Sequence, residues 1–276
     1  MALALILSSF VAADRIGGAA QQYVLAAHRI DPVLAPTVMF GRSPAKGGEG
    51  QVTAPPAFRR MLADIEADAV FGYVDLVITG HFSLAAQVEI AADALERIRA
   101  ASKRRPVVIV DPIMGDAPKG LYVGPEVAAA VADRLVPLAD WITPNLWELG
   151  RLAGAATTDA TSAAAAARKL GRPALVTSVP ARGGEIGILF VDAGTAVLFA
   201  HPKLEQAPNG TGDLVTASFG AGLVEGLAPL AAAERAARAV AEAVQAAKAW
   251  RTLDLPLVAM ADRLVSPTAE VRMERL

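Results

Sequence analysis

The sequence contains no cysteine among its 276 residues. Disulfide bonds and cysteine-based metal sites are therefore excluded, and a reducing compartment is compatible with the chain. Only three histidines are present, His28, His81 and His201, and they are too scattered to predict a zinc site. Aromatic residues make up 5% of the chain and hydrophobic residues 54%, so we expect a core built mostly of alanine, valine and leucine.

Strong charge and long hydrophobic runs are also missing. The formal net charge is −2, which provides no basic surplus for a nucleic-acid partner. No uninterrupted apolar stretch approaches the roughly 20 residues that span a bilayer, so we expect no membrane segment. Residues 1–13 are apolar, but they lack a positive n-region and are interrupted by Ser8 and Ser9. We interpret residues 3–7 as a buried strand rather than a secretory signal, and we expect a cytoplasmic protein.

Short apolar segments alternate with longer amphipathic ones along most of the chain. This alternation predicts parallel strands joined by helices that cover both faces of a sheet. Residues 186–191 and 195–200 flank Asp192-Ala193-Gly194 and predict a hairpin. No repeat or linker-like segment interrupts the pattern, so we expect one domain over residues 1–276. The predicted strands are 3–7, 74–79, 106–110, 141–143 and 174–177, and the predicted helices are 19–28, 84–101, 125–135, 146–153, 155–170 and 229–251.

The stretch Pro208-Asn209-Gly210-Thr211-Gly212-Asp213 carries the strongest chemical signal. Its two glycines permit unusual backbone angles, and they leave successive N–H groups free to point into one concavity. The apolar and small residues from Leu214 onward predict a helix. The free N–H groups then lie at a helix N-terminus, which is a favourable place for an anion.

Asp213 stands at the mouth of this predicted anion site, where its charge would repel a bound phosphate. The position suits a general base that takes a proton from an attacking hydroxyl. The amides of Gly210, Thr211 and Gly212 would then hold the charge that develops on a phosphoryl group. The alternative is that Asp213 only caps the helix. The stretch alone favours neither reading.

A second acidic segment, Asp111-Pro112-Ile113-Met114-Gly115-Asp116, follows the predicted strand 106–110. Ligands in open α/β sheets bind beyond the carboxyl ends of the strands, so Asp111 is placed for a metal or a polyphosphate. The alternative is a turn stabilised by aspartate and proline.

Asn145 and Glu148 follow the predicted strand 141–143 and are three residues apart. A carboxamide and a carboxylate together suit Mg²⁺ with its shell of water. Taken alone, the same spacing is better explained by a capping box at the start of a helix.

These motifs together resemble those of the pyridoxal kinase family within the ribokinase-like superfamily. That family shows an Asp-Pro-Val-Met-Gly-Asp run followed by Gly and Tyr-Val, and this chain has Asp111–Asp116 followed by Gly120 and Tyr122-Val123. The Asn145-x-x-Glu148 motif and Gly210–Asp213 come next in the family's order and at its spacing. The resemblance extends over nearly the whole chain.

The resemblance implies a three-layer α/β/α fold with a mostly parallel central sheet, ATP and Mg²⁺ as cosubstrates, and a homodimer. It implies ATP-dependent phosphorylation of the hydroxymethyl group of pyridoxal or a related B6 vitamer, giving the 5′-phosphate. In this scheme Asp213 is the base, and Gly210, Thr211 and Gly212 form the anion hole. The residues implied on the ATP side are Asp111, Thr143, Asn145, Glu148, Thr177 and Ser178, with Asn145 and Glu148 positioning Mg²⁺ through water.

The chain departs from the family at the end that binds the acceptor. Ser8 is kept after the first strand, but the tyrosine and first glycines that usually follow are not. After Phe40 the family tends to show Ser-Asn-His-Thr, whereas this chain has Gly41-Arg42-Ser43-Pro44. We predict that Ser8, Arg42 and Ser43 contact the acceptor, and that Arg42 changes which acceptor is preferred.

Residues 41–56 are rich in glycine and polar groups and lie between apolar segments. Most such segments are plain surface loops. A loop of this length inside a compact domain can also be a mobile cover over a substrate, which is the functional interpretation.

Three alternative functions stay open at this stage. The acceptor could be another small heterocyclic alcohol such as hydroxymethylpyrimidine, because the departures lie in the acceptor region. The chain could also be a non-catalytic vitamer-binding paralogue. A Rossmann oxidoreductase has little support, since only Gly17-Gly18 follows the first strand, without the glycine pattern of a dinucleotide site.

Overall fold

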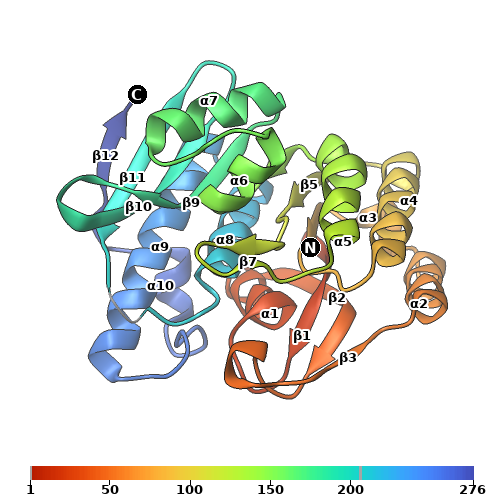
Figure 1. Cartoon of the computed structure of the whole chain (residues 1–276). Coiled ribbons are helices and arrows are strands. Elements are labelled where there is room, and N and C mark those ends of the chain that lie inside the picture. Colours follow the sequence, from red (N-terminus) through yellow and green to blue (C-terminus); the bar gives the residue numbers. More distant parts are fainter. Residues whose placement is uncertain (1, 205–206) are drawn as a thin grey trace.

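The computed structural model of the protein describes residues 2–204 and 207–276 (Figure 1). Ten strands of this described part form one sheet, in the spatial order β12-β11-β10-β9-β8-β5-β4-β1-β2-β3. The parallel part of the sheet consists of β9, β8, β5, β4, β1 and β2. Strands β3, β10, β11 and β12 are antiparallel to their neighbours. Their bounds are β1 Ala2–Val11, β2 Ile30–Phe40, β3 Gly50–Val52, β4 Leu76–Thr79, β5 Val107–Val110, β8 Trp141–Ile142, β9 Ala174–Pro180, β10 Glu185–Val191, β11 Ala196–Pro202 and β12 Arg272–Arg275.

Helices cover both faces of this sheet, which makes three layers. Buried side chains of α1, α8, α9 and α10 pack on one face, and those of α2 to α7 pack on the other. In Figure 1, α6 and α7 lie in front of the sheet and α9 lies behind it. The bounds are α1 Gly17–Ala27, α2 Pro55–Ala67, α3 Val70–Tyr73, α4 Ala85–Ala101, α5 Pro125–Ala130, α6 Leu146–Ala153, α7 Ala160–Leu170, α8 Thr211–Val224, α9 Pro229–Trp250 and α10 Ala261–Val265.

Every strand and helix that the sequence predicts is present. The predicted hairpin is confirmed, because β10 and β11 pair antiparallel with Val191 opposite Ala196. The predicted helix 125–135 is helical throughout, although α5 gives way to a π-helical turn at Val131–Leu135. Periodicity therefore predicts the parallel half of the sheet and its crossover helices well.

Strand β2, which contains Pro32 and Pro36, was not predicted from the sequence. These prolines are tolerated because this part of the strand pairs only with β1, and β3 joins β2 only from Val38 onward. Proline lacks a backbone donor and is therefore accepted where one side of a strand is unpaired. The pattern of the strand is hidden by the same two residues.

Residues 41–56 are more ordered than a plain loop. A 3₁₀ turn forms at Pro44–Lys46, β3 pairs with the end of β2, and α2 begins at Pro55. A two-stranded ribbon of β6 (Gly115–Asp116) and β7 (Gly120–Leu121) was also not predicted. Both features border the cavity described below.

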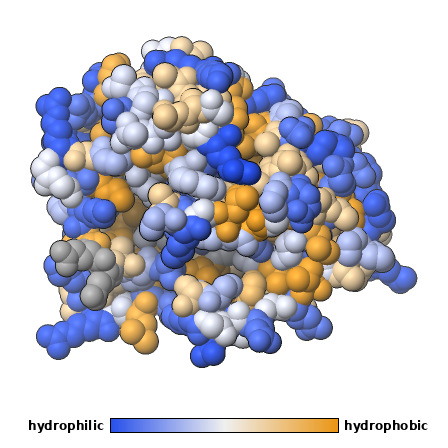
Figure 2. Space-filling view, in the orientation of Figure 1, coloured by the Kyte–Doolittle hydropathy of each residue, from blue (hydrophilic) through white to orange (hydrophobic). Residues whose placement is uncertain are grey.

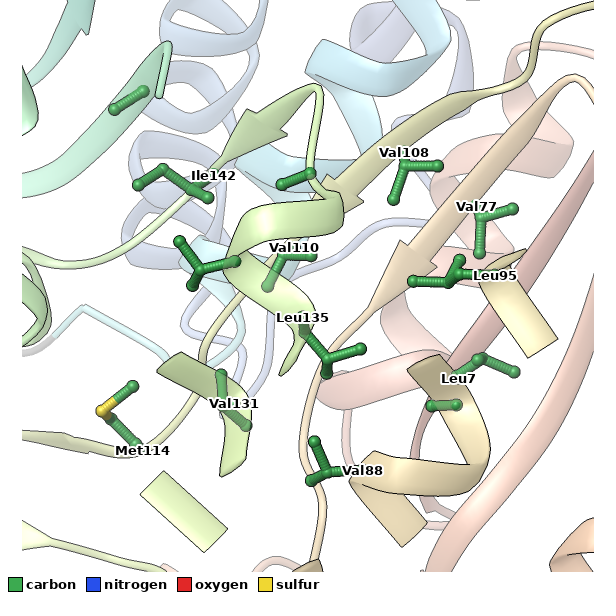
Figure 3. Close-up of a cluster of buried hydrophobic side chains, with 14 of the residues drawn as sticks. Leu7, Val77, Val88, Leu95, Val108, Val110, Met114, Val131, Leu135 and Ile142 are labelled. Atoms are coloured by element: carbon green, nitrogen blue, oxygen red, sulfur yellow. The ribbon is translucent and has the colours of Figure 1, made fainter. Parts of the chain in front are cut away.

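The core is built mainly from small aliphatic side chains, as the composition predicts. Val77 of β4 and Val108 of β5 belong to one apolar cluster with Leu95 of α4 and Leu135 (Figure 3). On the other face α8 lies close to the sheet. A Cβ on Gly220 would come within 2.8 Å of the Leu76 side chain, so any larger residue at this position would make that side chain shift.

Within the described ranges, no helix is both long enough and apolar enough to cross a membrane.

Candidate functional site

A cavity of about 820 Å³ opens at the carboxyl ends of the parallel strands. Its walls come from the end of β1, the β2–β3 segment, the segment after β4, the β6–β7 ribbon and the turn before α8. The surface is hollowed near the middle of the face shown in Figure 2, and hydrophobic residues lie around this hollow. Ligands of open α/β sheets bind at this edge, so the cavity is the candidate site.

The turn before α8 has the geometry that the sequence predicts for an anion site. Gly210 is the N-cap residue with φ +94°, in the left-handed region. A Cβ there would come within 2.1 Å of the Arg15 carbonyl oxygen, so glycine is required for two reasons. Leu214 is the first residue whose N–H bonds back into the helix, to Gly210 O at 3.0 Å. The N–H groups of residues 211–213 precede it and belong to the free first turn.

Asp213 lines the cavity within this first turn and is 8% exposed. Its Oδ2 accepts a hydrogen bond from the Gly17 N–H at 2.8 Å, and Gln21 Nε2 lies 3.5 Å from Oδ1. Burial raises the pKa of Asp213 to about 6, although the Gly17 N–H acts in the opposite direction. The carboxylate is thus held by α1 and directed at the cavity, which suits a base better than a helix cap.

Asp111 and Thr143 lie just beneath this turn. Asp111 directly follows β5, Thr143 directly follows β8, and both contact the hydroxyl of Thr216 on α8. Burial, and then the negative charges of Glu148 and Asp213, raise the pKa of Asp111 well above its ordinary value. A positive charge brought to this edge of the sheet would relieve that repulsion.

Asn145 and Glu148 form the capping box that was one of the two readings of their spacing. Asn145 Oδ1 accepts from the Glu148 N–H, and Glu148 Oε2 accepts from the Asn145 N–H, each at 2.9 Å. Glu148 Oε1 also accepts from the N–H groups of Met114 and Gly115. Burial raises the pKa of Glu148 to about 7 against these hydrogen bonds. The pair therefore fixes the segment that follows β5 and Asp111.

Thr177 and Ser178 belong to β9, beside the start of α6. The Thr177 N–H donates to Pro144 O at 2.9 Å, which ties β9 to the Asn145 segment. Ser178 is exposed and has φ +60°, which is uncommon for a residue other than glycine. Strained backbone of this kind often marks a ligand contact.

The three residues predicted for the acceptor lie in different surroundings. Ser8 is fully buried, and its Oγ accepts from the His81 N–H at 3.3 Å. Ser43 lines the cavity. Arg42 is exposed, and its guanidinium donates to Gly47 O at 3.3 Å within its own loop. Arg42 is not among the described residues that border the cavity.

Asp14 fixes the loop that carries Ser43. Its carboxylate accepts from the Ser43 N–H and pairs with Lys46, whose Nζ also lies 3.4 Å from Asp254 Oδ1. Burial alone would raise the pKa of Asp14, but the hydrogen bonds from Lys46 and Ser43 hold it below its ordinary value. Asp14 is thus an anchor for this loop, which the sequence analysis did not foresee.

Several residues around the cavity were not predicted as site residues. Ser9 and His81 line the acceptor side, and Lys119 lines the β6–β7 side together with Tyr122, which the sequence identified only as part of a motif. Burial lowers the pKa of His81 to about 4, so its ring is neutral near pH 7. The only available signal was position, since His81 comes two residues after a predicted strand.

The fold can be compared with solved structures now that the geometry is described. Pyridoxal kinase from Leishmania donovani, in complex with ADP and pyridoxamine, superimposes over 100% of both chains with a TM-score of 0.92 at 23% identity. The structure thus has the ribokinase-like fold, as the motifs predicted.

Sequence comparisons give the family. The phosphomethylpyrimidine kinase family matches residues 57–257. Pyridoxal kinase PdxY of Leifsonia xyli is 35% identical over 223 residues, 78% of each chain. The pyridoxine/pyridoxal/pyridoxamine kinase of Bordetella avium is 33% identical over 244 residues, 86% of this chain and 82% of that protein. The chain therefore belongs to the pyridoxal kinases of the phosphomethylpyrimidine kinase family.

Proposed function

We propose that this protein uses ATP to phosphorylate the hydroxymethyl group of pyridoxal or a related B6 vitamer, giving the 5′-phosphate. The observation that carries the proposal is Asp213, directed into the cavity within the free first turn of α8. The names of the relatives support the same reaction. Because Asp213 and the glycine turn are both present, a purely binding role has less support.

The site residues account for the chemistry in one step. Ionised Asp213 takes the proton of the acceptor hydroxyl, whose oxygen forms the new bond to the γ-phosphorus. The bond from this phosphorus to the β–γ bridging oxygen breaks, and ADP leaves. The amides of residues 211–213 stabilise the charge on the transferred group. The Gly17 N–H keeps the carboxylate turned toward the acceptor.

The nucleotide is assigned to the strand ends next to this turn. We place ATP near Thr143, Asn145, Thr177 and Ser178, because Thr143 and Asn145 follow β8 and the neighbouring strand β9 brings Thr177 beside Asn145. Asp111 lies near this group, and its pKa is raised first by burial and then by the negative charges of Glu148 and Asp213.

Mg²⁺ suits this edge of the sheet, where the carboxylates of Asp111, Glu148 and Asp213 lie near one another. Asp116 lines the cavity and has one buried carboxylate oxygen with no hydrogen-bond partner among the described residues. No group of three or more acidic or histidine side chains in the described ranges could hold a metal by itself. We therefore propose that Asn145 and Glu148 position Mg²⁺ through water, with the nucleotide phosphates supplying other ligands. The ion would neutralise phosphate charge.

The acceptor is assigned to the other end of the cavity. Its walls there are mainly apolar, with Ser9, Ser43 and His81 as polar groups, while Ser8 supports the His81 backbone from below. An apolar slot with a few polar groups suits a flat heterocycle. Arg42 would reach the acceptor only after its guanidinium leaves Gly47.

We further propose that residues 1–276 act as one kinase domain, in which residues 41–56 cover the acceptor. One continuous sheet contains strands from both ends of the described chain, which supports this reading. We also propose a homodimer, as the family resemblance implies, and a cytoplasmic location, where ATP is available. Light scattering on the purified protein tests the first of these two assignments, and cell fractionation tests the second.

The function is tested by incubating the purified protein with Mg-ATP and pyridoxal, pyridoxine, pyridoxamine or hydroxymethylpyrimidine, and measuring ADP and the phosphorylated product. We expect turnover with at least one B6 vitamer. Preference for hydroxymethylpyrimidine would support the alternative that the matched family's description suggests. ADP release without any phosphorylated alcohol would contradict both.

A further inference from the structure

Thr216 lies on α8, one turn after Asp213, and makes contacts that the proposed chemistry does not use. It is fully buried. Its hydroxyl oxygen lies 3.0 Å from Asp111 Oδ2 and 2.8 Å from Thr143 Oγ1. Asp111 and Thr143 end the neighbouring parallel strands β5 and β8. One hydroxyl therefore connects the helix that carries the base to the ends of two strands.

The number of hydroxyl hydrogens limits which groups can donate in these two hydrogen bonds. A threonine hydroxyl has one hydrogen, so Thr216 can donate to only one of its two partners. An ionised Asp111 can only accept, so Thr216 then donates to Asp111 and Thr143 donates to Thr216. A protonated Asp111, which its raised pKa favours, can instead donate to Thr216, which then donates to Thr143. In either state the Thr216 hydroxyl bonds to both partners. Removing the central hydroxyl would leave both buried neighbours without these bonds, which is costly in a dry environment.

The strand ends are themselves fixed in the sheet. The Asp111 N–H donates to Thr79 O, and the Thr143 N–H donates to Val110 O, each at 3.0 Å. Ser218 offers a contrast on the same helix. It is also fully buried, but its hydroxyl has no hydrogen-bond partner among the described residues. The connection is therefore specific to Thr216 and is not shared by every buried hydroxyl on α8.

We propose that Thr216 is a positioning residue whose hydroxyl holds the first turn of α8 in register with the strand ends. Thr216 does not border the cavity, so it acts through Asp213 and the amides of residues 211–213. The inference rests on the proposed function, because phosphoryl transfer is sensitive to the placement of the base. A misplacement of about 1 Å can cost roughly 100-fold in rate.

The test compares Thr216→Val, which keeps the shape, with Thr216→Ser, which keeps the hydroxyl, and with Ser218→Ala as the control. We expect Thr216→Val to lower kcat by roughly 10- to 100-fold, with little change in the KM of the acceptor. Thr216→Ser and Ser218→Ala should stay close to the wild-type kcat. Thermal unfolding of each variant allows rates to be expressed per folded enzyme.

A second measurement does not depend on any substrate. Hydrogen exchange of the amides of residues 214–217 should be faster in Thr216→Val than in Thr216→Ser or Ser218→Ala. If Thr216→Val turns over and exchanges like the wild type, or if Thr216→Ser loses as much activity as Thr216→Val, the proposal is wrong. If the wild type phosphorylates no vitamer but the exchange contrast is present, the proposed function fails and the positioning role stands.

Discussion

The Gly17 N–H donates a hydrogen bond to Asp213 Oδ2 at 2.8 Å, across 196 positions of sequence. It brings the start of α1 against the start of α8 and fixes the direction of the one carboxylate that the glycine turn presents to the cavity. The two residues come from the two segments that sequence reasoning had treated separately, the end of the first strand and the anion turn.

Asp213→Asn should abolish turnover while leaving the fold intact. Asparagine keeps an oxygen that can accept from Gly17 but cannot take the acceptor's proton. We expect kcat to fall by about 10²–10⁴-fold, the usual contribution of a general base. ATP binding by calorimetry should be close to wild type. A variant that retains the wild-type rate on its best substrate would exclude Asp213 as the base.

The raised pKa of Asp213 predicts how stability depends on pH. Burial moves this pKa from an ordinary 3.8 to about 6, so the folded protein binds a proton more tightly than the unfolded chain between these values. The contribution to stability is fully present below pH 3.8 and is lost as the pH rises through about 6. Asp213→Asn should therefore be more stable than the wild type above pH 6, by up to about 3 kcal/mol.

Denaturant unfolding of both proteins between pH 4 and pH 8 measures this difference. It should grow as the pH rises and level off above about 6. A difference that does not change with pH would show that Asp213 titrates near its ordinary value. In that case the acid limb of kcat/KM should also lie well below pH 6.

Gly210→Ala and Gly212→Ala form a matched pair in the anion turn. Gly210 has φ +94° and its Cβ would meet the Arg15 carbonyl, whereas a Cβ on Gly212 would point into open space. We expect Gly210→Ala to destabilise the fold by at least about 1–3 kcal/mol. Gly212→Ala should leave the melting temperature unchanged but lower kcat, because its methyl group enters the space proposed for the phosphoryl group. Equal effects of the two variants on stability would contradict this geometry.

Glu148→Gln should raise the Mg²⁺ requirement more than the acceptor KM. The expected rise in half-saturating Mg²⁺ is roughly tenfold, typical for the loss of an outer-sphere partner. Glutamine would also place its NH₂ group against backbone N–H groups that now donate to the Glu148 carboxylate. Because this could destabilise the fold, the melting temperature must be measured in parallel. Glu126→Gln, at an exposed position on α5, is the control. An unchanged magnesium titration would remove Glu148 from the metal site.

Residues 41–50 contain two cations, and the variants Lys46→Met and Arg42→Ala test the role of each one separately. Lys46 pairs with Asp14, which also holds the Ser43 backbone, while Arg42 donates a hydrogen bond to Gly47 within its own loop. We expect Lys46→Met to raise the acceptor KM about fivefold, the equivalent of roughly 1 kcal/mol. Hydrogen exchange of the loop should rise with it. A larger effect from Arg42→Ala would instead support the prediction that the Arg42 guanidinium reaches the acceptor.

The parallel part of the fold could be predicted from the sequence, because it is determined by the period of the apolar residues and the spacing of the apolar segments. The alternation of short apolar and long amphipathic segments recovered β1, β4, β5, β8 and β9 with their helices. β2 was hidden by Pro32 and Pro36, whose tolerance depends on which strand edge is paired. β12 was missed because Arg272–Arg275 has no apolar alternation and pairs only with β11, at the edge of the sheet.

Those parts of the candidate site that consist of short sequence motifs could be predicted. Gly210–Asp213 and Asn145–Glu148 are short motifs, and the structure places both at the carboxyl edge of the sheet. The partners of Asp213 and Ser43 could not be predicted, because Gly17 and Asp14 reach them only through the tertiary fold. The direction of the Arg42 side chain likewise depends on a carbonyl within a turn that no motif specifies.

The position of β1 has a consequence for synthesis of the protein. This strand is made before the other strands of the sheet, yet it lies inside the sheet between β2 and β4, and one of its faces is covered by α8 and α1. Chains leave the ribosome from the N-terminus, so β1, α1 and β2 emerge long before residue 211. For most of translation the nascent sheet exposes the apolar face that α8 and α9 later cover. Until α8 has been made, the growing chain therefore lacks the glycine turn and Asp213, and the apolar face stays available for association with other exposed apolar surfaces.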